Sequence, residues 1–287
     1  MAGTSMKDIK LRIKSVESTM QITKAMELVA SSKLRKAKER QERLRPYFEE
    51  LGKTLSDIET AADGRISPYQ DAQSLVKQCL IVIAGDRGLA GGYNANVLKR
   101  ALAEMEQPGI ETCIIPIGKR TLDFALRNSI EVVTDEFAEA ATISVPDCLT
   151  IGHLVSRGYM SGKFQKVTVI YTRFVSLLSQ VPETESLLPL QSLRREREKK
   201  STVEQLMLIE PDPVSVFEAI VPNYLGGMVY GAVCESVASE LGARRTAMDA
   251  ASKNAAEMIS DLSLKYNRAR QDAITQEITE IVAGAEH

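Results

Sequence analysis

The feature that most constrains this chain is a seven-residue repeat of apolar side chains through its first sixty residues. From residue 9 onward these side chains recur at alternating spacings of four and three, and only Thr23, Glu27 and Gln41 interrupt a register of sixteen positions. Such a register predicts a long helix that buries one seam against another helix, as in a coiled coil. The apolar members are Ile9, Ile13, Val16, Met20, Ala30, Leu34, Ala37, Leu44, Phe48, Leu51, Leu55, Ile58 and Ala62.

The last seventy residues carry a second apolar stripe, formed by Met248, Ala251, Ala255, Met258 and Leu262. At 1.5 Å per residue, the two terminal helices would be roughly 80 and 105 Å long. Neither length fits inside a domain of this size, so we expect both helices to project from the intervening residues as an antiparallel pair. A projecting two-helix rod favours a mechanical or scaffolding role over a ligand pocket.

The middle of the chain predicts an α/β domain. Predicted strands at 79–84, 112–117, 131–134 and 166–174 alternate with helical patterns at 97–105, 120–127 and 149–162, and 175–193 fits an edge strand followed by a loop. This alternation predicts a parallel sheet with helical crossovers. The expected divisions are 1–62 for the N-terminal helix, 75–193 for the α/β domain, 194–212 for a charged linker and 213–287 for the C-terminal helix. Pro222 and Gly226-Gly227 are expected to bend the last helix near its start.

The C-terminal helix is the longer of the two, so its tip should extend beyond its partner by roughly 25 Å. The tip contains Ile274, Ile278, Ile281, Val282 and Ala283, which make it too apolar for a lone helix in water. Fraying or self-association is one interpretation. Apolar content that continues almost to the end of the chain favours a surrounding partner.

Charge is unevenly distributed along the chain. Residues 7–45 carry twelve Lys and Arg against five Asp and Glu, whereas the whole chain has a net charge of −2. Three interpretations remain open on the residues alone: a solvated helix face, a nucleic-acid surface, or a surface for an acidic protein partner. The densest part, the basic stripe, comprises Lys33, Arg35, Lys36, Lys38, Arg40, Arg43 and Arg45.

Composition argues against several other classes of protein. No run of 18 apolar residues is present, so no transmembrane helix is predicted, and Met1–Ser5 is too short and polar for a signal peptide, with Met6 a suitable natural start. The four cysteines lack paired spacing and are expected to be small buried hydrophobes. A structural role is expected for His153, and no metal or cofactor is predicted.

A glycine-rich segment, Gly85 to Gly92, follows the first strand and precedes a helix, as phosphate-binding loops do. It lacks the Gly-Lys-Ser/Thr of a Walker loop and the Gly-x-Gly-x-x-Gly spacing of dinucleotide-binding proteins. A tight connection between strand and helix is therefore the better interpretation. No nucleophile elbow or zinc-protease motif occurs, so the sequence predicts no catalysis by this chain alone.

Three segments closely resemble the ATP synthase gamma subunit family. They are the opening (MKDIKLRIKSV at 6–16 and QITKAMELVASSK at 21–33), the loop DRGLAGGYN at 86–94, and the ending (YNRARQ at 266–271 and ITQEITEIVAGA at 274–285). The three blocks span the chain in the family's order. Ala90 stands where many members have Cys, and residues 190–213 lack the regulatory insertion of the chloroplast form, so thiol switching is not implied.

The resemblance implies a rotor shaft of a proton- or sodium-translocating F-type ATP synthase, peripheral on the cytoplasmic face of the cell membrane. Its paired helices would turn inside three alpha and three beta subunits, while its α/β domain would rest with the epsilon subunit on the membrane c-ring. Catalysis would reside on the beta subunits, and no nucleic-acid partner is implied. The interface residues that the resemblance implies are Met26, Lys33, Arg35, Lys36, Arg40, Arg244, Arg270, Gln271, Thr275 and Glu277.

Two other classes of function compete with the rotor shaft. A coiled-coil scaffold explains the long helices but not the specific C-terminal block. A nucleotide-dependent enzyme would use the loop Gly85 to Gly92, and would require the isolated chain to bind nucleotide. At the polar interface positions the alternative is pairing within the helix, for example of Arg270 or Gln271 with nearby carboxylates.

Overall fold

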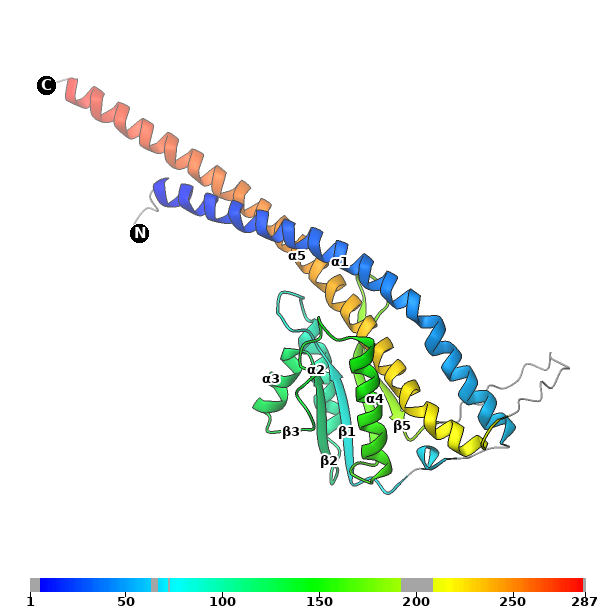
Figure 1. Ribbon diagram of the computed structural model, residues 1–287. Helices are drawn as coiled ribbons and strands as arrows, with labels where there is room; N and C mark the ends of the chain where they lie inside the picture. Colours follow the sequence, from blue (N-terminus) through cyan, green and yellow to red (C-terminus); the bar gives the residue numbers. More distant parts are fainter. Residues whose placement is uncertain (1–5, 63–66, 72, 192–208, 286–287) are drawn as a thin grey trace. The chain divides into compact units, whose positions relative to one another are not determined.

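The computed structural model describes residues 6–62, 67–71, 73–191 and 209–285 (Figure 1). Residues 1–5 and most of the expected linker 194–212 lie outside the described residues. The elements are α1 (Met6–Ala61), the 3-10 helix η1 (Pro68–Gln70), β1 (Lys77–Ile83), α2 (Tyr93–Met105), β2 (Glu111–Ile117), α3 (Lys119–Arg127), β3 (Glu131–Val132), α4 (Val145–Met160), β4 (Lys166–Phe174), β5 (Gln180–Leu188) and α5 (Pro213–Ala285). Two compact units result: residues 33–243, and the terminal segments 1–32 with 244–287.

The unit 33–243 contains a five-stranded sheet in the order β3-β2-β1-β4-β5. β1 pairs in parallel with β2 and with β4, and β3 pairs in parallel with β2. β5 is antiparallel to β4 and forms one edge. The expected fold class, an α/β insert between two long terminal helices, is confirmed, with the refinement that the sheet is mixed at this edge.

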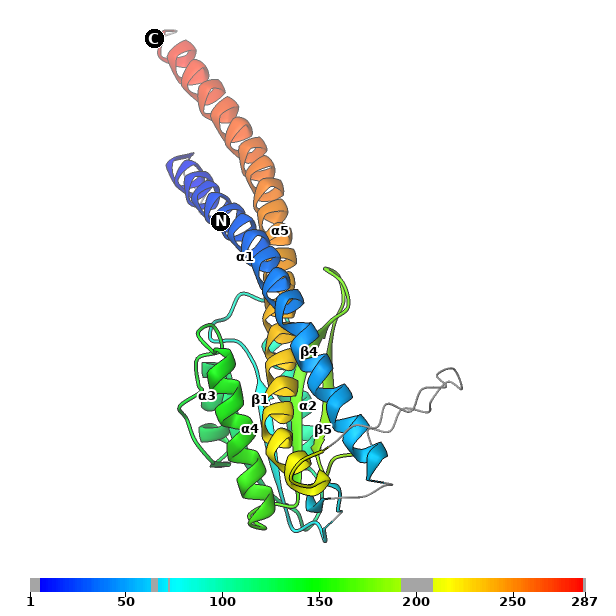
Figure 2. The ribbon, with the colours of Figure 1, turned by 45° about the vertical axis from the view of Figure 1, so that its right-hand side comes forward.

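Helices cover both faces of the sheet (Figure 2). Along β1, alternate side chains enter two separate apolar clusters, one containing Ile81 and the other Val82. The cluster around Val82 is completed by α2 and α3, and the cluster around Ile81 by α4 and by the parts of α1 and α5 that belong to this unit. Burial on both faces explains why the central strands are continuous apolar runs in the sequence.

The glycines near the start of α5 allow close packing against two other helices. A Cβ placed on Gly152 of α4 would lie 2.6 Å from the backbone nitrogen of Gly226, and one placed on Gly226 would lie 2.8 Å from Leu149 Cα. A Cβ placed on Gly227 would lie 2.8 Å from Cε1 of Phe48 on α1 and closer still to another atom of that ring. α5 is a continuous helix through this stretch. These contacts give the glycines a role in the close approach of helices, and the expected bend stays a prediction.

In the unit 33–243, α1 and α5 pack in antiparallel directions. Leu34 clusters with Leu241, and the ring of Phe48 lies 5.8 Å from that of Tyr230. Gly52 lies against Tyr224. The residue numbers of the α5 partners therefore decrease as those of α1 increase, which is the order of an antiparallel pair. In the unit of the terminal segments, the start of α1 and the end of α5 lie at the same end in both views (Figures 1 and 2). All sixteen positions of the predicted α1 register are buried or half-buried, which confirms the seam.

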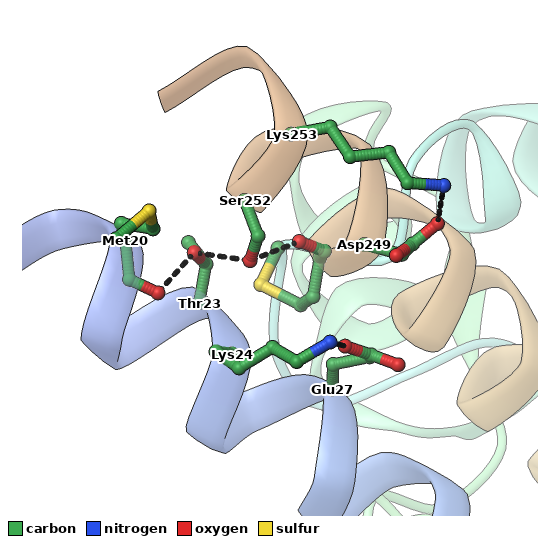
Figure 3. Close-up of polar contacts among 8 residues, drawn as sticks. Met20, Thr23, Lys24, Glu27, Asp249, Ser252 and Lys253 are labelled. Atoms are coloured by element: carbon green, nitrogen blue, oxygen red, sulfur yellow. Dashed lines mark hydrogen bonds and ion pairs between the residues drawn. The ribbon is translucent and has the colours of Figure 1, made fainter. Parts of the chain in front are cut away.

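Two hydroxyl groups meet in the seam of the terminal segments (Figure 3). The oxygens Thr23 Oγ1 and Ser252 Oγ lie 2.7 Å apart, and each residue is more than nine-tenths buried. Thr23 Oγ1 is within 3.0 Å of the carbonyl oxygen of Met20, and Ser252 Oγ within 2.9 Å of that of Met248. Thr23, which interrupts the apolar register in the sequence, is thus satisfied by a partner on the other helix.

The α5 side of this seam differs from the sequence prediction at one position. Met248, Ala255 and Leu262 are buried as expected, but Met258 is 46% exposed. Ser252 is buried and Ile259 is half-buried instead. Between Ala255 and Leu262, a seven-residue repeat can take its intermediate position three residues on, at Met258, or four residues on, at Ile259. The prediction took Met258, which was wrong, because the structure covers Ile259.

We expect the Thr23–Ser252 pair to show strong coupling in a double-mutant cycle of chemical denaturation. Thr23→Val or Ser252→Ala alone should lower the free energy of unfolding by about 1–3 kcal/mol, because one buried hydroxyl loses its partner. The double variant should lose less than the sum of the single effects, because it removes both polar groups. Thr19→Val, at an exposed position on the same helix, is the control. Additive losses would contradict the pairing.

Candidate interaction surfaces

The α5 tip, defined here as residues 270–281, exposes a row of isoleucines. Ile274, Ile278 and Ile281 are 47%, 56% and 71% exposed, and their spacing of four and three places them on one face of the helix. The last buried residue of α5 is Leu262, and Ala273 is the last half-buried one, among the residues whose burial is described. The side chains of Val282 and Ala283 lie outside the described residues.

Polar side chains flank this row on both sides. At 3.6 residues per turn, Gln271 and Thr275 follow one side of the isoleucine row, and Arg270 and Glu277 follow the other. All four are exposed. The tip therefore presents an apolar strip bordered by groups that can form directional hydrogen bonds.

Pairing within the helix does not occupy these polar side chains. Among the described residues, Gln276 donates to Glu280 at 2.9 Å and Thr279 donates to the carbonyl oxygen of Thr275 at 2.8 Å. No ion pair or side-chain hydrogen bond of Arg270, Gln271 or Glu277 is found in the described part of the tip. Pairing of these side chains with carboxylates of the same helix, the alternative to an interface role, is thus not seen at these positions in the described residues.

Two further predicted interface residues lie in the paired part of the terminal segments. Met26 on α1 and Arg244 on α5 are both half-buried. Each therefore keeps part of its side chain available at the surface.

Every residue of the basic stripe is exposed, but their charges are not equivalent. Arg45 Nε lies 2.6 Å from Glu49 and Arg35 Nε lies 3.8 Å from Glu39, so both pair along the helix. Lys38 Nζ stands 4.2 Å above the centroid of the Phe174 ring. Such exposed pairs contribute only about 0–1 kcal/mol each. The members of the predicted interface in this stripe are Lys33, Arg35, Lys36 and Arg40.

Lys36 and Arg40 also line a cavity of about 180 Å³ that reaches α5. Burial raises the pKa of the Tyr230 hydroxyl in its wall to about 12, with Cys234 as a further cause, and the nearby Arg40 works in the opposite direction. Burial likewise raises the pKa of Cys234. Both groups therefore stay protonated at neutral pH, and the positive charge of this wall comes from Lys36 and Arg40.

The glycine-rich loop is stabilised by its own aspartate. Asp86 Oδ1 accepts hydrogen bonds from the backbone N–H of Lys119 at 3.1 Å and of Ala140 at 3.0 Å, and Oδ2 accepts from that of Ala141 at 3.0 Å. Lys119 is the first residue of α3, so the carboxylate lies at that helix N-terminus. Asn94 accepts from the backbone N–H of Gly85 at 2.8 Å. This arrangement fits a structural connection, because the carboxylate joins the loop to the start of α3 and to residues 140 and 141.

The described residues contain no group of three or more His, Cys, Asp or Glu side chains that could hold a metal ion. None of the helices, as far as they are described, is long and apolar enough to cross a membrane. The four cysteines are buried, as predicted, and burial raises the pKa of the Cys148 thiol to about 12. His153 lies at an exposed position on α4.

Comparison with known proteins identifies relatives along almost the whole chain. A family model described as ATP synthase matches residues 5–287. The ATP synthase gamma chain of Ruminococcus albus is 46% identical over 96% of each chain, and that of Alkaliphilus metalliredigens is 42% identical over 99% of each chain. A protein of Acetobacterium woodii named ATP synthase gamma chain, sodium ion specific, is 40% identical over 98% of each chain.

Solved structures share the fold as well. A chain of the Euglena gracilis mitochondrial ATP synthase, in a structure of OSCP/F1/c-ring, has a TM-score of 0.66 at 19% identity, covering 99% of this chain and 95% of that one. A chain in the Tetrahymena thermophila mitochondrial ATP synthase central stalk/c-ring structure has a TM-score of 0.57 at 23% identity. It covers 80% of this chain and 99% of that one. The fold is thus one found in ATP synthase assemblies, and the chain belongs to the ATP synthase gamma-chain family.

The structure gathers the predicted interface residues into three places, and the roles of these residues remain predictions. Arg270, Gln271, Thr275 and Glu277 share the α5 tip. Met26 and Arg244 lie in the paired helices of the same unit, and the four stripe residues lie on α1 in the unit 33–243. Sequence reasoning missed the Thr23–Ser252 pair and the contact of Lys38 with Phe174, because partners so distant in sequence leave no local signal.

We expect Asp86→Ala to lower the free energy of unfolding by about 1–3 kcal/mol, because three backbone N–H groups lose their acceptor. Asp86→Asn should lie between this variant and the unmodified chain, since an amide retains one acceptor oxygen. Asp123→Ala, an exposed aspartate on α3, should have little effect. Urea denaturation of the three variants measures the effect. An Asp86→Ala chain as stable as the control would show that the loop does not need this carboxylate.

Proposed function

We propose that this chain is the central rotor shaft of a proton- or sodium-translocating F-type ATP synthase. In this proposal it couples ion-driven rotation to the nucleotide states of a surrounding hexamer of three alpha and three beta subunits. The α/β domain would rest, with the epsilon subunit, on the membrane c-ring at the cytoplasmic face of the cell membrane. Membership of the gamma-chain family along residues 5–287 supports this assignment.

The observation that carries the proposal is the exposed apolar tip of α5. Ile274, Ile278 and Ile281 would lie in water if the chain worked alone, and exposed apolar rows of this kind mark contact sites. A ring of subunits around the tip would bury these side chains. The basic stripe, exposed on α1, would face acidic loops of the beta subunits, where matched potentials favour docking.

The proposal places catalysis on the beta subunits rather than on this chain. Asp86, in the loop that resembled a phosphate site, instead accepts three backbone hydrogen bonds, one of them at the start of α3, as expected of a structural connection. The shaft would act by contacting three beta subunits differently, because it is asymmetric and they are alike. A contact that favours one nucleotide state shifts the population of that subunit, and rotation moves the preference from one beta subunit to the next.

Co-purification under mild conditions tests the class of function. We expect the tagged chain to bring down alpha, beta and epsilon subunits together with ATPase activity, and the partner-free chain to have no ATPase turnover. Recovery of the chain as a self-associated filament without these subunits would favour the scaffold. Turnover by the partner-free chain, abolished by Asp86→Ala, would favour the enzyme.

The two kinds of group at the tip should have separable roles. Ile274→Gln with Ile278→Gln should weaken assembly by about 2 kcal/mol in total, or roughly thirtyfold in affinity, because apolar burial is lost. Leu264→Gln, at a position 57% exposed in the paired part of α5, is the matched control. Affinity of the chain for the alpha/beta hexamer is the measurement.

Gln271→Leu and Glu277→Leu should instead leave the complex assembled and alter coupling, because directional hydrogen bonds define dwell positions whereas apolar contact does not. Rotation of single complexes with a bead on the α/β domain measures coupling. If the complex assembles normally with the isoleucine variant but delivers no torque, the apolar strip itself transmits force. That result would contradict the assignment of assembly to the isoleucines and of coupling to Gln271 and Glu277.

A further inference from the structure

We propose that a contact between the end of β4 and α5 locks the α/β domain to the helix pair and transmits rotation from the domain to α1 and α5. This β4–α5 latch consists of Thr172 and Phe174 on β4 and of Ser236 and Ser239 on α5. All four residues belong to the unit 33–243. The inference rests on the proposed rotor function and assigns to these residues a positioning role within it.

The polar part of the latch binds the main chain of β4 through side chains of α5. Ser236 Oγ accepts a hydrogen bond from the Thr172 N–H at 3.2 Å, and Ser239 Oγ donates to the Thr172 carbonyl oxygen at 2.9 Å. Both serines are completely buried, so water does not compete for these bonds.

The same serine joins a third element to the latch. Ser236 Oγ lies 3.0 Å from the hydroxyl oxygen of Tyr93, which is the first residue of α2 and is 5% exposed. The sheet, α2 and α5 therefore meet at one buried hydroxyl group. Displacing α5 relative to the sheet would break contacts with both elements.

The end of β4 has free main-chain groups because its neighbour β1 is shorter. Pairing of β1 with β4 ends at Val82 and Ile170, whereas β4 continues to Phe174. On its other side, β4 stays paired with β5 as far as Phe174 and Gln180. Buried N–H and C=O groups need partners, and α5 supplies them where β1 has ended. The helix thus takes the place of a strand for the last residues of β4.

Phe174 extends the latch to both long helices. Its ring belongs to the apolar cluster of Leu34 on α1 with Leu241 on α5. A Cβ placed on Gly242 would lie 3.0 Å from the ring, so the glycine leaves the space that the ring uses. The ammonium group of Lys38, on α1, lies over the ring face, where a cation is attracted to the aromatic quadrupole. One side chain of the sheet therefore contacts α1 and α5 together.

These contacts differ in kind from the large apolar cluster that α5 shares with the sheet. Apolar contact is non-directional, so it resists separation of α5 from the sheet but resists rotation and sliding less. Hydrogen bonds weaken steeply as their angle departs from linear, and the Phe174 ring packs closely where Gly242 has no side chain. The latch is therefore the set of contacts best suited to make the helices turn with the domain.

Torsional stiffness of the assembled complex tests the proposal. With the hexamer fixed and a bead on the α/β domain, the angular spread of the bead at a dwell reports the stiffness of the path between them. Ser236→Ala with Ser239→Ala should increase the angular variance about twofold, because the hydrogen bonds of both serines to the main chain of β4 are lost. Ser260→Ala, at an exposed position on α5, should leave it unchanged.

A surface variant keeps the test valid if the buried serine variant folds poorly. Lys38→Met should also widen the angular spread, and Lys38→Arg should restore it, because Arg retains a cation over the ring. Lys53→Met, an exposed lysine on the same helix outside the basic stripe, is the control. Assembled variants with the unmodified angular spread would overturn the latch alone. An unmodified chain that neither assembles nor rotates would overturn the rotor function as well.

Discussion

The seam between α1 and α5 is the interaction on which the rest of this structure depends. Each helix carries its apolar side chains on one stripe, and a helix of this length gains most of its stability from covering such a stripe. All sixteen positions of the α1 register are covered at least partly. Because the two helices lie at opposite ends of the sequence, their pairing also holds together the two ends of the inserted α/β domain. Burial of the seam therefore organises both units.

α5 meets a different environment in each part of its length, and its sequence changes accordingly. Between residues 213 and 243 it is a core helix, packed on the sheet, on α4 and on α1, with Gly226 and Gly227 at the closest approaches. From 244 to 273 only one stripe is covered, and between 274 and 281 the side chains are exposed. The apolar content nevertheless persists into the tip. Apolar side chains kept where this chain offers no cover are the physical reason to infer a surrounding partner.

Periodicity predicted those parts of the fold in which burial follows a repeat. The α1 seam and the parallel strands are of this kind, because a buried stripe and a strand buried on both faces leave regular patterns. The antiparallel strand β5 was less clear, since the half-buried Glu183 and the exposed Glu185 interrupt its pattern. Met258 was misassigned because two registers satisfy one repeat.

The candidate site came from the resemblance to a family rather than from spacing, since an exposed Gln271 or Glu277 looks like any solvated helix residue. The exposure and the bonding partners of its residues could be known only from the structure. Exposure at the tip, the different partners of Lys38 and Arg45, and the carboxylate of Asp86 at the start of α3 all depend on three-dimensional neighbours. The hydroxyl pair of Thr23 and Ser252 is separated by 229 residues, so no local pattern could predict it.

Under the proposed function, the distribution of polar and apolar contacts has a mechanical meaning. A shaft must transmit a turning force where it is attached and must turn with little resistance where it is enclosed. Buried hydrogen bonds at Ser236 and Ser239 fix an angle because they are directional. The isoleucines of the tip provide contact that depends on buried area rather than on angle, so rotation within an apolar sleeve meets small barriers. These two requirements are opposite, and α5 meets them with different side chains. Buried hydroxyl groups attach it to the sheet, and an exposed apolar strip allows rotation at the tip.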